Sequence, residues 1–359
     1  MAESSELPAN GSPRRRAPAH VTLQNIAERA NVHVSTVSRA LDPHPARPVS
    51  VETVAKIRAI AAELGFEPNP WARSLRTNRT RTLGLVIPRL VDNVLTVVFE
   101  AAENAALGLG YQAITVSTGD DPVRVQEAIR RLLDRRVDGF VIATARIDDP
   151  TIDDLSSRHV PFVLLNRANG DNVCFRSDDE LGAYLATRHL LERGHRRIAH
   201  ASAVSGTSTS EDRRIGYARA LESAGLEVDE HLVVESGLGI DGGVEVGNQL
   251  LTRKARPSAI FAANDFVAVG IMEAARDLGI RVPDDLALVG YNDTRLGSAL
   301  TVPLSSVAIP LADMGARAVE ELAHLIEGKP VHSRVFPVQL KIRASSATRV
   351  GPSLVEAES

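Results

Sequence analysis

Cysteine, aromatic side chains and long hydrophobic runs are all scarce in this chain. Of its 359 residues one is a cysteine and 4% are aromatic. A single thiol, Cys174, excludes a disulfide framework and a thiolate metal site. No stretch of 18 or more uncharged apolar residues occurs, so no membrane span is expected. The first twenty residues contain three arginines but no apolar run after them, which argues against a secretory signal, and we expect a cytoplasmic protein.

The charge is unevenly distributed along the chain. Residues 1–81 contain twelve Lys and Arg against seven Asp and Glu, which gives this part a net charge of +5. The whole chain carries −4, so the remaining residues carry −9. A basic amino-terminal part joined to an acidic body indicates a nucleic-acid-binding unit attached to a unit of a different kind. The plainer alternative is a disordered arginine-rich tail.

Hydrophobic periodicity predicts a multidomain α + α/β chain. The sequence predicts tails at residues 1–19 and 350–359. It predicts three short helices over 20–67, and a hinge helix with a linker over 68–81. Over 82–349, short apolar runs alternate with amphipathic stretches of helical period. Such alternation predicts parallel sheets with helices on both faces, and some ten strands are too many for one sheet, so we expect two doubly wound lobes. The last strands are expected as a short pair near Val335–Ile342.

The first two short helices form a candidate DNA-reading unit. They are joined by a turn at Asn31–His33, as in helix-turn-helix proteins, whose second helix enters the major groove. The outward face of the second helix offers Val34, Ser35, Ser38 and Arg39. Arg39 can bond guanine through two donors or clamp a phosphate. The alternative is a three-helix bundle that binds no DNA.

Two dense strings of residues point to one protein family. They are Thr22-Leu23-x-x-Ile26-Ala27-x-x-Ala30-x-Val32-x-x-x-Thr36-Val37-Ser38-Arg39-x-Leu41 and Leu64-Gly65-Phe66-x-Pro68-Asn69-x-x-Ala72-Arg73-Ser74-Leu75. The chain resembles the lac repressor (LacI/GalR) family of bacterial transcription regulators over about residues 20–349. It departs from the family at His33, where a serine usually caps the second helix. Two extra residues lie in the loop between Leu41 and Ser50.

The resemblance assigns DNA contacts to the first helices and to the hinge. Asn69-Pro70 can start a helix that is too short to be stable alone. In the family, hinge helices of two subunits pair in the minor groove, and a leucine at the position of Leu75 wedges into a base step. The DNA-binding residues implied are Thr22, Val34, Ser35, Thr36, Ser38, Arg39, Asn69, Ala72, Arg73, Leu75 and Arg76. Without the resemblance, a plain interdomain linker remains the alternative.

The resemblance also implies a body of the periplasmic-binding-protein type I kind, with a ligand cleft between its lobes. One lobe is expected at 82–177 plus 309–336, and the other at 178–306 plus 337–349. The effector-binding residues implied are Leu95, Thr96, Ser177, Thr207, Thr209, Arg213, Leu238, Asn264, Asp265 and Asn292.

Three of these positions depart from the family pattern. Asn292 and Ser177 stand where acidic residues are frequent, and Leu238 replaces a common aromatic ring. The expected cleft therefore keeps a hydrogen-bonding arginine and amide but lacks carboxylates and stacking rings. A carbohydrate or related polyhydroxy effector is favoured because that ligand class is the commonest in the family. For each polar residue the alternative is a helix cap or a surface group.

Enzyme functions are weakly supported. Gly237-x-Gly239-x-x-Gly242 matches a dinucleotide fingerprint, but a lone match is weak and lies late in the chain. His189, His195 and His200 are too far apart for a helical metal pair. No nucleophile elbow or phosphate-binding Walker loop is present. We therefore expect no catalytic residue, no cofactor and no metal.

The favoured interpretation is a ligand-responsive transcription regulator that binds a palindromic operator as a homodimer. Its expected partners are double-stranded DNA, a small carbohydrate effector and a second copy of itself. Repression released by the effector is the family default, and activation and co-repression stay open. The tail after Ser345 has no heptads, which favours a dimer over a tetramer. A solute-binding protein or a dehydrogenase-like enzyme is the competing class, and specific operator binding with a steep salt dependence would separate them.

Overall fold

The computed structural model describes residues 21–41, 48–66, 79–89 and 93–347, without the side chains of 93–95. The expected tails and the expected hinge helix lie outside these ranges. Internal contacts divide the chain into one unit over Met1–Asn78 and another over Arg79–Ser359. None of the helices in the described ranges is long and apolar enough to cross a membrane.

Residues 21–41 and 48–66 of the first unit contain three helices, as the sequence predicts for this part. They are α1 (Leu23–Ala30), α2 (Val34–Ala40) and α3 (Val51–Glu63). Thr22 caps α1 in a reciprocal capping box with Asn25, and Ser50 caps α3. Apolar side chains from all three helices meet in one small core, which includes Ile26, Val37 and Ile57.

The second unit begins with a sheet of six parallel strands in the order β11-β5-β4-β3-β1-β2. The strands are β1 (Thr82–Ile87), β2 (Gln112–Ser117), β3 (Gly139–Ile142), β4 (Phe162–Leu165), β5 (Cys174–Ser177) and β11 (Arg334–Phe336). The helices are α5 (Asn93–Gly108), α6 (Pro122–Asp134), α7 (Pro150–Ser157) and α13 (Leu311–Ile326). We call this part the amino-terminal lobe.

The carboxy-terminal lobe contains the other sheet, in the order β12-β10-β9-β8-β6-β7. Its strands are β6 (Ile198–Ser202), β7 (Val233–Glu235), β8 (Ala259–Ala262), β9 (Ala287–Asn292), β10 (Ser305–Ala308) and β12 (Gln339–Lys341). Its helices are α8 (Asp179–Glu192), α9 (Ser208–Ser223), α10 (Ile240–Leu251), α11 (Asp265–Asp277) and α12 (Arg295–Ala299), with short 3₁₀ turns at Glu230–Leu232 and Ala344–Ser346. All strands are parallel except β12.

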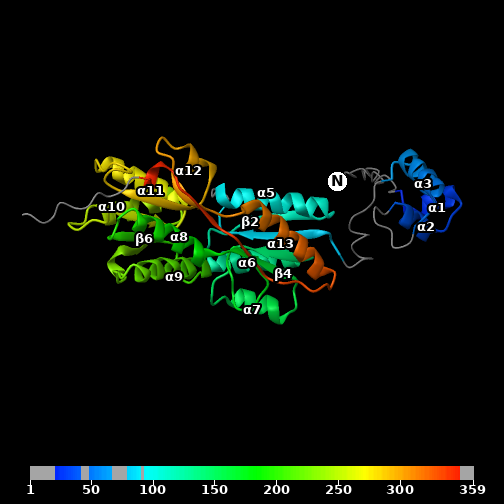
Figure 1. The fold of residues 1–359 in the computed structure, drawn as a ribbon. Helices are drawn as coiled ribbons and strands as arrows, with labels where there is room; N and C mark the ends of the chain where they lie inside the picture. The colour runs from blue at the N-terminus through cyan, green and yellow to red at the C-terminus, as the bar shows by residue number, and fades with distance from the viewer. Residues whose placement is uncertain (1–20, 42–47, 67–78, 90–92, 348–359) are drawn as a thin grey trace, which may run out of the picture. The chain divides into compact units, whose positions relative to one another are not determined.

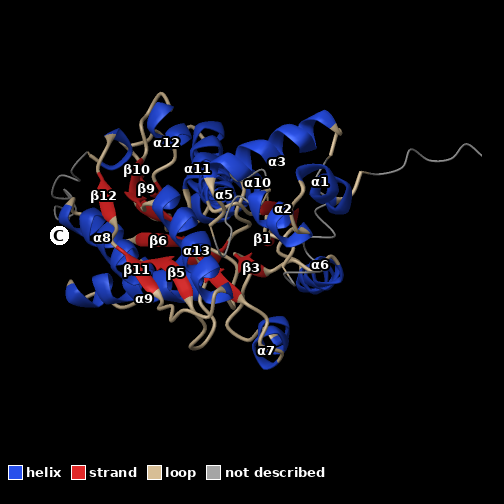
Figure 2. Cartoon of the chain, turned by 90° about the vertical axis from the view of Figure 1, so that its right-hand side faces the viewer, coloured by secondary structure: helices blue, strands red, loops and turns tan. Residues whose placement is uncertain are grey.

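Both sheets are covered by helices, which confirms the two doubly wound lobes. In Figure 1 the two lobes lie next to each other, each with its own helices. Figure 2 shows the strands of the body surrounded by helices. Central strands such as β1 and β9 are buried along almost their full length, as expected for parallel strands covered on both faces. The carboxyl ends of the strands, where ligands bind in such sheets, therefore supply the candidate site.

The expected strand pair near Val335–Ile342 is wrong. β11 pairs with β5 and β12 pairs with β10, so the two strands belong to different sheets. The chain passes from one lobe to the other between them. The sequence reading also missed β5 and β10, because Arg176 and the serines of β10 interrupt the apolar runs that mark the other strands.

Glycines at the start of α10 and in α11 allow close packing of the backbone. A Cβ atom on Gly242 would lie 2.5 Å from the carbonyl oxygen of Gly237. A Cβ on Gly243 would lie 2.3 Å from the Val267 carbonyl oxygen, and one on Gly270 would lie 2.0 Å from that of Ile240. Gly243 of α10 and Gly270 of α11 let these two helices approach until their backbones touch. Of the three glycines spaced like a dinucleotide fingerprint, Gly242 packs against the backbone of Gly237, whereas a Cβ on Gly239 would meet nothing within 4 Å.

Candidate functional site

The second helix of the helix-turn-helix unit begins at a histidine. The side chain of His33 caps α2, since its Nδ1 accepts from the backbone N–H of Ser35 at 3.2 Å. The same nitrogen lies 2.8 Å from the Ser35 hydroxyl. The departure from the family serine noted above therefore preserves the cap. A capped amino terminus places the first residues of α2 at the surface in a defined orientation.

The exposed side of α2 carries the residues expected to read DNA. Val37 is buried, whereas Ser35 is exposed. The other expected residues of α2, Val34, Thr36, Ser38 and Arg39, are half-buried. The Arg39 guanidinium donates to the Ser35 carbonyl at 3.2 Å and to the Thr36 hydroxyl at 3.3 Å, so it lies along its own helix. Thr22 is exposed and serves as the α1 cap. The expected hinge contacts Asn69, Ala72, Arg73, Leu75 and Arg76 lie outside the described residues.

In the body, a cavity of about 560 Å³ lies where both lobes meet. Its lining comes from α5 (Thr96, Val97), from the end of β9 and the start of α12 (Asn292, Asp293, Thr294, Arg295, Leu296), and from the passage between β10 and α13 (Ala308, Ile309, Pro310, Leu311, Ala312, Asp313). This volume suits a small-molecule ligand. Two expected effector residues, Thr96 and Asn292, line the cavity. Leu95 lies in α5, but its side chain is not described.

Asn292 is a largely buried polar residue of the cavity lining. It is 8% exposed and has a φ of +95°. Within the described part of the chain its side-chain amide has no hydrogen-bond partner, so both amide atoms can serve a ligand. The neighbouring Asp293 is engaged by an ion pair with Arg343 at 2.6 Å. The apolar remainder of the wall includes Val97 and Leu311.

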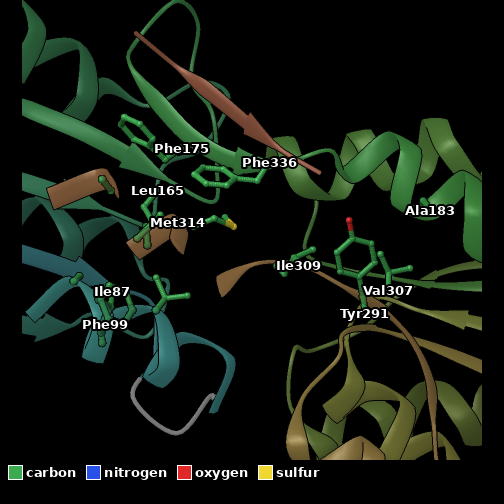
Figure 3. Packing of buried hydrophobic residues seen from close by; sticks show 14 of the residues in the cluster. Ile87, Phe99, Leu165, Phe175, Ala183, Tyr291, Val307, Ile309, Met314 and Phe336 are labelled. Carbon is green, nitrogen blue, oxygen red and sulfur yellow. The ribbon is translucent and has the colours of Figure 1, made fainter. Parts of the chain in front are cut away.

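Arg213 is buried in the carboxy-terminal lobe and is not part of the cavity lining. Its guanidinium group contacts several neighbouring groups. Its Nε and Nη2 each lie 2.7 Å from Oδ1 of Asp179, and its Nη1 donates to the Ala263 carbonyl. Its guanidinium carbon is 3.7 Å from the centre of the Tyr291 ring. The Ser177 hydroxyl donates to the other Asp179 oxygen at 3.1 Å. Figure 3 shows the Tyr291 side chain pointing toward the helix that carries Ala183, which is α8.

The sequence reading missed Asp179, which supplies a carboxylate beside the expected arginine. The arginine is 7% and the aspartate 0% exposed at the side chain. The sequence contains a signal for this carboxylate, because two aspartates, Asp178 and Asp179, directly follow a buried strand. Asp178 caps α8, which leaves Asp179 to point inward. Asp179 is not part of the cavity lining, in which the carboxylates are those of Asp293 and Asp313.

The pair Asn264 and Asp265 is fully engaged within the protein. Asn264 caps α11 and donates to the Leu238 carbonyl at 2.9 Å. Asp265 is 0% exposed and accepts from the Thr294 backbone N–H, the Thr294 hydroxyl and the Ser306 hydroxyl at 2.6, 2.8 and 2.6 Å. Burial raises the pKa of Asp265 to about 6 against the opposing effect of these bonds. This geometry supports a structural role for Asp265.

Loops of the two lobes also touch near the start of α9. The Ile147 amide donates to the Gly206 carbonyl at 3.1 Å, and the Ala168 amide donates to the Ser208 hydroxyl at 2.8 Å. Thr207 caps α9 and lies 3.3 Å from the hydroxyl of Thr209. The expected residues Thr207 and Thr209 thus stand beside the lobe contact, away from the cavity lining.

Comparisons with known proteins agree on both units. A family model described as bacterial regulatory proteins, lacI family, matches residues 22–69, and one for a periplasmic binding protein-like domain matches 187–346. The HTH-type transcriptional repressor PurR of Photobacterium profundum is 30% identical over 90% of this chain and 98% of its own length. The ribose operon repressor of Haemophilus influenzae is 34% identical over 89% and 96%. The lac repressor dimer bound to operator and the anti-inducer ONPF has a TM-score of 0.79 at 27% identity, over 91% of this chain and 99% of that one.

Proposed function

From the premise that this chain belongs to the lacI family of bacterial regulatory proteins, we propose which of its residues read DNA and which bind its effector. The protein is a transcription repressor that binds a DNA operator as a dimer and responds to a small molecule, and it is not an enzyme. We place it in the cytoplasm, where its DNA target would be.

The DNA contacts proposed are those of α2 and of the hinge. Ser35, Ser38 and Arg39 reach base edges in the major groove, and Arg39 leaves its own helix to bond a guanine or a phosphate. Asn69, Ala72, Arg73, Leu75 and Arg76 form the minor-groove part of the interface.

The effector is proposed to bind in the cavity between the lobes. The observation that carries this proposal is the nine-tenths-buried amide of Asn292, which opens into a volume lined from both lobes. Thr96 lines the same cavity from the amino-terminal lobe. A ribose operon repressor among the relatives favours a carbohydrate. Effector binding would change the orientation of the lobes and so alter the hinge and DNA affinity.

Replacing Arg39 with Ala tests the DNA part. The probe is a duplex selected by the purified protein from a pool of random sequences. We expect a loss of about 10- to 100-fold in affinity for this duplex, the range for one good base contact. The matched control is Arg58→Ala on the exposed side of α3, which should bind as the wild type does. Equal affinities of the Arg39 and Arg58 variants, measured by fluorescence anisotropy, would contradict the proposed role of Arg39.

A further inference from the structure

We propose that Asp138 is a specificity-determining residue for DNA, because it helps to fix the point at which the chain leaves the body toward the DNA-binding unit. In a dimer, the positions of these two points limit the spacing of the two operator half-sites that can be bound together. This inference rests on the dimer and on the hinge contacts proposed above, and it adds a determinant of specificity that touches no base.

The point of attachment is the segment 79–81, which begins the second unit and directly precedes β1. In the sequence, Thr77 and Asn78 separate it from Arg76, the last hinge residue proposed to contact DNA. The three steps of chain from Arg76 to Arg79 span at most about 11 Å, even when fully extended. The hinge therefore stays close to the segment 79–81, and any movement of this segment is passed on to the hinge.

Asp138, which directly precedes β3, binds the backbone of this segment with both carboxylate oxygens. Its Oδ1 accepts from the Thr80 backbone N–H at 2.7 Å, and its Oδ2 accepts from the Arg81 backbone N–H at 3.0 Å. The Thr80 hydroxyl lies 3.0 Å from Oδ1 of Asp138 and 2.7 Å from the Arg136 carbonyl oxygen, so two acceptors share its proton. Hydrogen bonds to an ionised carboxylate are stronger than bonds between neutral groups, so Asp138 is the main fastening of the segment.

Two arginines of the segment add contacts to other elements of the amino-terminal lobe. The Arg79 guanidinium donates to the Ile326 carbonyl, at the end of α13, at 2.8 Å. The Arg81 guanidinium carbon lies 4.9 Å from the centre of the Tyr111 ring, just before β2. The φ of Arg81 is +54°, a left-handed conformation that persists in a non-glycine residue where its neighbours hold it. The segment is thus attached beside β2, β3 and α13.

A firm attachment makes a wrong half-site spacing costly. One added base pair moves a half-site by about 3.4 Å along the duplex and turns it by about 35° around the axis. A loose attachment would let the DNA-binding units shift to meet the altered spacing. It would also lower the affinity for the correct spacing, because the second unit would be found less often at its half-site. Asp138 therefore raises the difference between the two affinities, which is the measure of specificity.

The test compares the selected duplex with two duplexes that have one base pair added or removed at the centre of the site. Fluorescence anisotropy gives the affinities of the wild type, Asp138→Ala and Asp121→Ala. Asp121 is a matched control, because it also binds two backbone N–H groups of this lobe, at the start of α6. We expect the wild type and the control to prefer the selected duplex by about 100-fold, and Asp138→Ala to prefer it by about 10-fold or less.

A preference of Asp138→Ala equal to that of the wild type would overturn the inference, and so would a wild type that binds all three duplexes equally. If Asp138→Ala does not fold, Thr80→Val and Arg79→Met replace it. Each removes one contact of the segment, and an unchanged preference in both would overturn the inference. Failure of the proposed hinge looks different: Leu75→Ala would then bind the selected duplex as tightly as the wild type does, whatever the preference of Asp138→Ala.

Discussion

Buried histidines in the carboxy-terminal lobe make the stability of the body depend on pH. His200 is 0% exposed and lies between Tyr217 and Phe261, with ring centres 5.3 and 4.8 Å away. Its Nδ1 lies 3.1 Å from the Phe261 carbonyl, whereas Nε2 has no partner among the described residues. Burial lowers the pKa of His200 to about 4, and burial likewise lowers the pKa of His195 to about 4.

Acid should therefore destabilise the protein. A histidine with a lowered folded pKa contributes stability above its unfolded pKa of 6.5, and this is lost as the pH falls toward about 4. Each such histidine accounts for about 2 kcal/mol between pH 7 and pH 5. Asp265 acts in the opposite direction, because its raised pKa favours the folded state at pH values below about 6. Two histidines outweigh this one carboxyl group.

The change His200→Phe tests this account. Phenylalanine keeps the stacking and cannot take up a proton, so the free energy of unfolding should fall by about 2 kcal/mol less between pH 7 and pH 5 than in the wild type. Denaturant unfolding at the two pH values measures this difference. The exposed His332→Phe is the control and should keep the wild-type difference. An unchanged pH dependence in His200→Phe would show that His200 is not a source of the acid sensitivity.

Among the helices, the α10–α11 pair is sensitive to a single added methyl group. Gly270→Ala would place a Cβ 2.0 Å from a backbone carbonyl oxygen, which a backbone cannot accommodate without moving. We expect a loss of about 1–3 kcal/mol or more in the free energy of unfolding. Gly108→Ala is the matched control, because this helical glycine has nothing within 4 Å of the added Cβ.

That control should be neutral or stabilising by about 0.5–1 kcal/mol, the usual gain of alanine over glycine in a helix. Urea unfolding of the two variants measures both effects. If Gly270→Ala were as stable as Gly108→Ala, the close approach of α10 and α11 would not be required for the fold.

Some elements could be predicted from the sequence and others could not. Strands such as β4 (Phe162–Leu165) and β8 (Ala259–Ala262) are uninterrupted apolar runs, which is the pattern that the sequence marks most clearly. The sequence did not predict β5 and β10, because polar residues interrupt their apolar runs. These polar residues make long-range contacts, for example Ser306 with Asp265 and Arg176 with Asp212. Hydrophobic periodicity indicates which face of an element is buried, but it does not indicate which distant residue a polar side chain will contact.

At the scale of the whole molecule, the sequence predicted the family, the helix-turn-helix unit and the two lobes, and the comparisons confirm them. The site residues are harder to predict. The family resemblance points to Arg213, but its partner Asp179 lies 34 positions earlier and meets it only in the folded lobe. Asn292 and Thr96 share a cavity for the same reason, because strand order and the passages between lobes bring them together.

The central claim is that a small-molecule effector, held at the cavity of Asn292, weakens operator binding by the first unit. The most direct measurement is the affinity for the selected duplex in the presence of neutral sugars, compared between the wild type and Asn292→Ala. The account predicts a sugar that weakens duplex binding by about 5- to 150-fold in the wild type, the usual range of allosteric coupling, and has little effect in the variant. A sugar that weakened duplex binding equally in both proteins would contradict it.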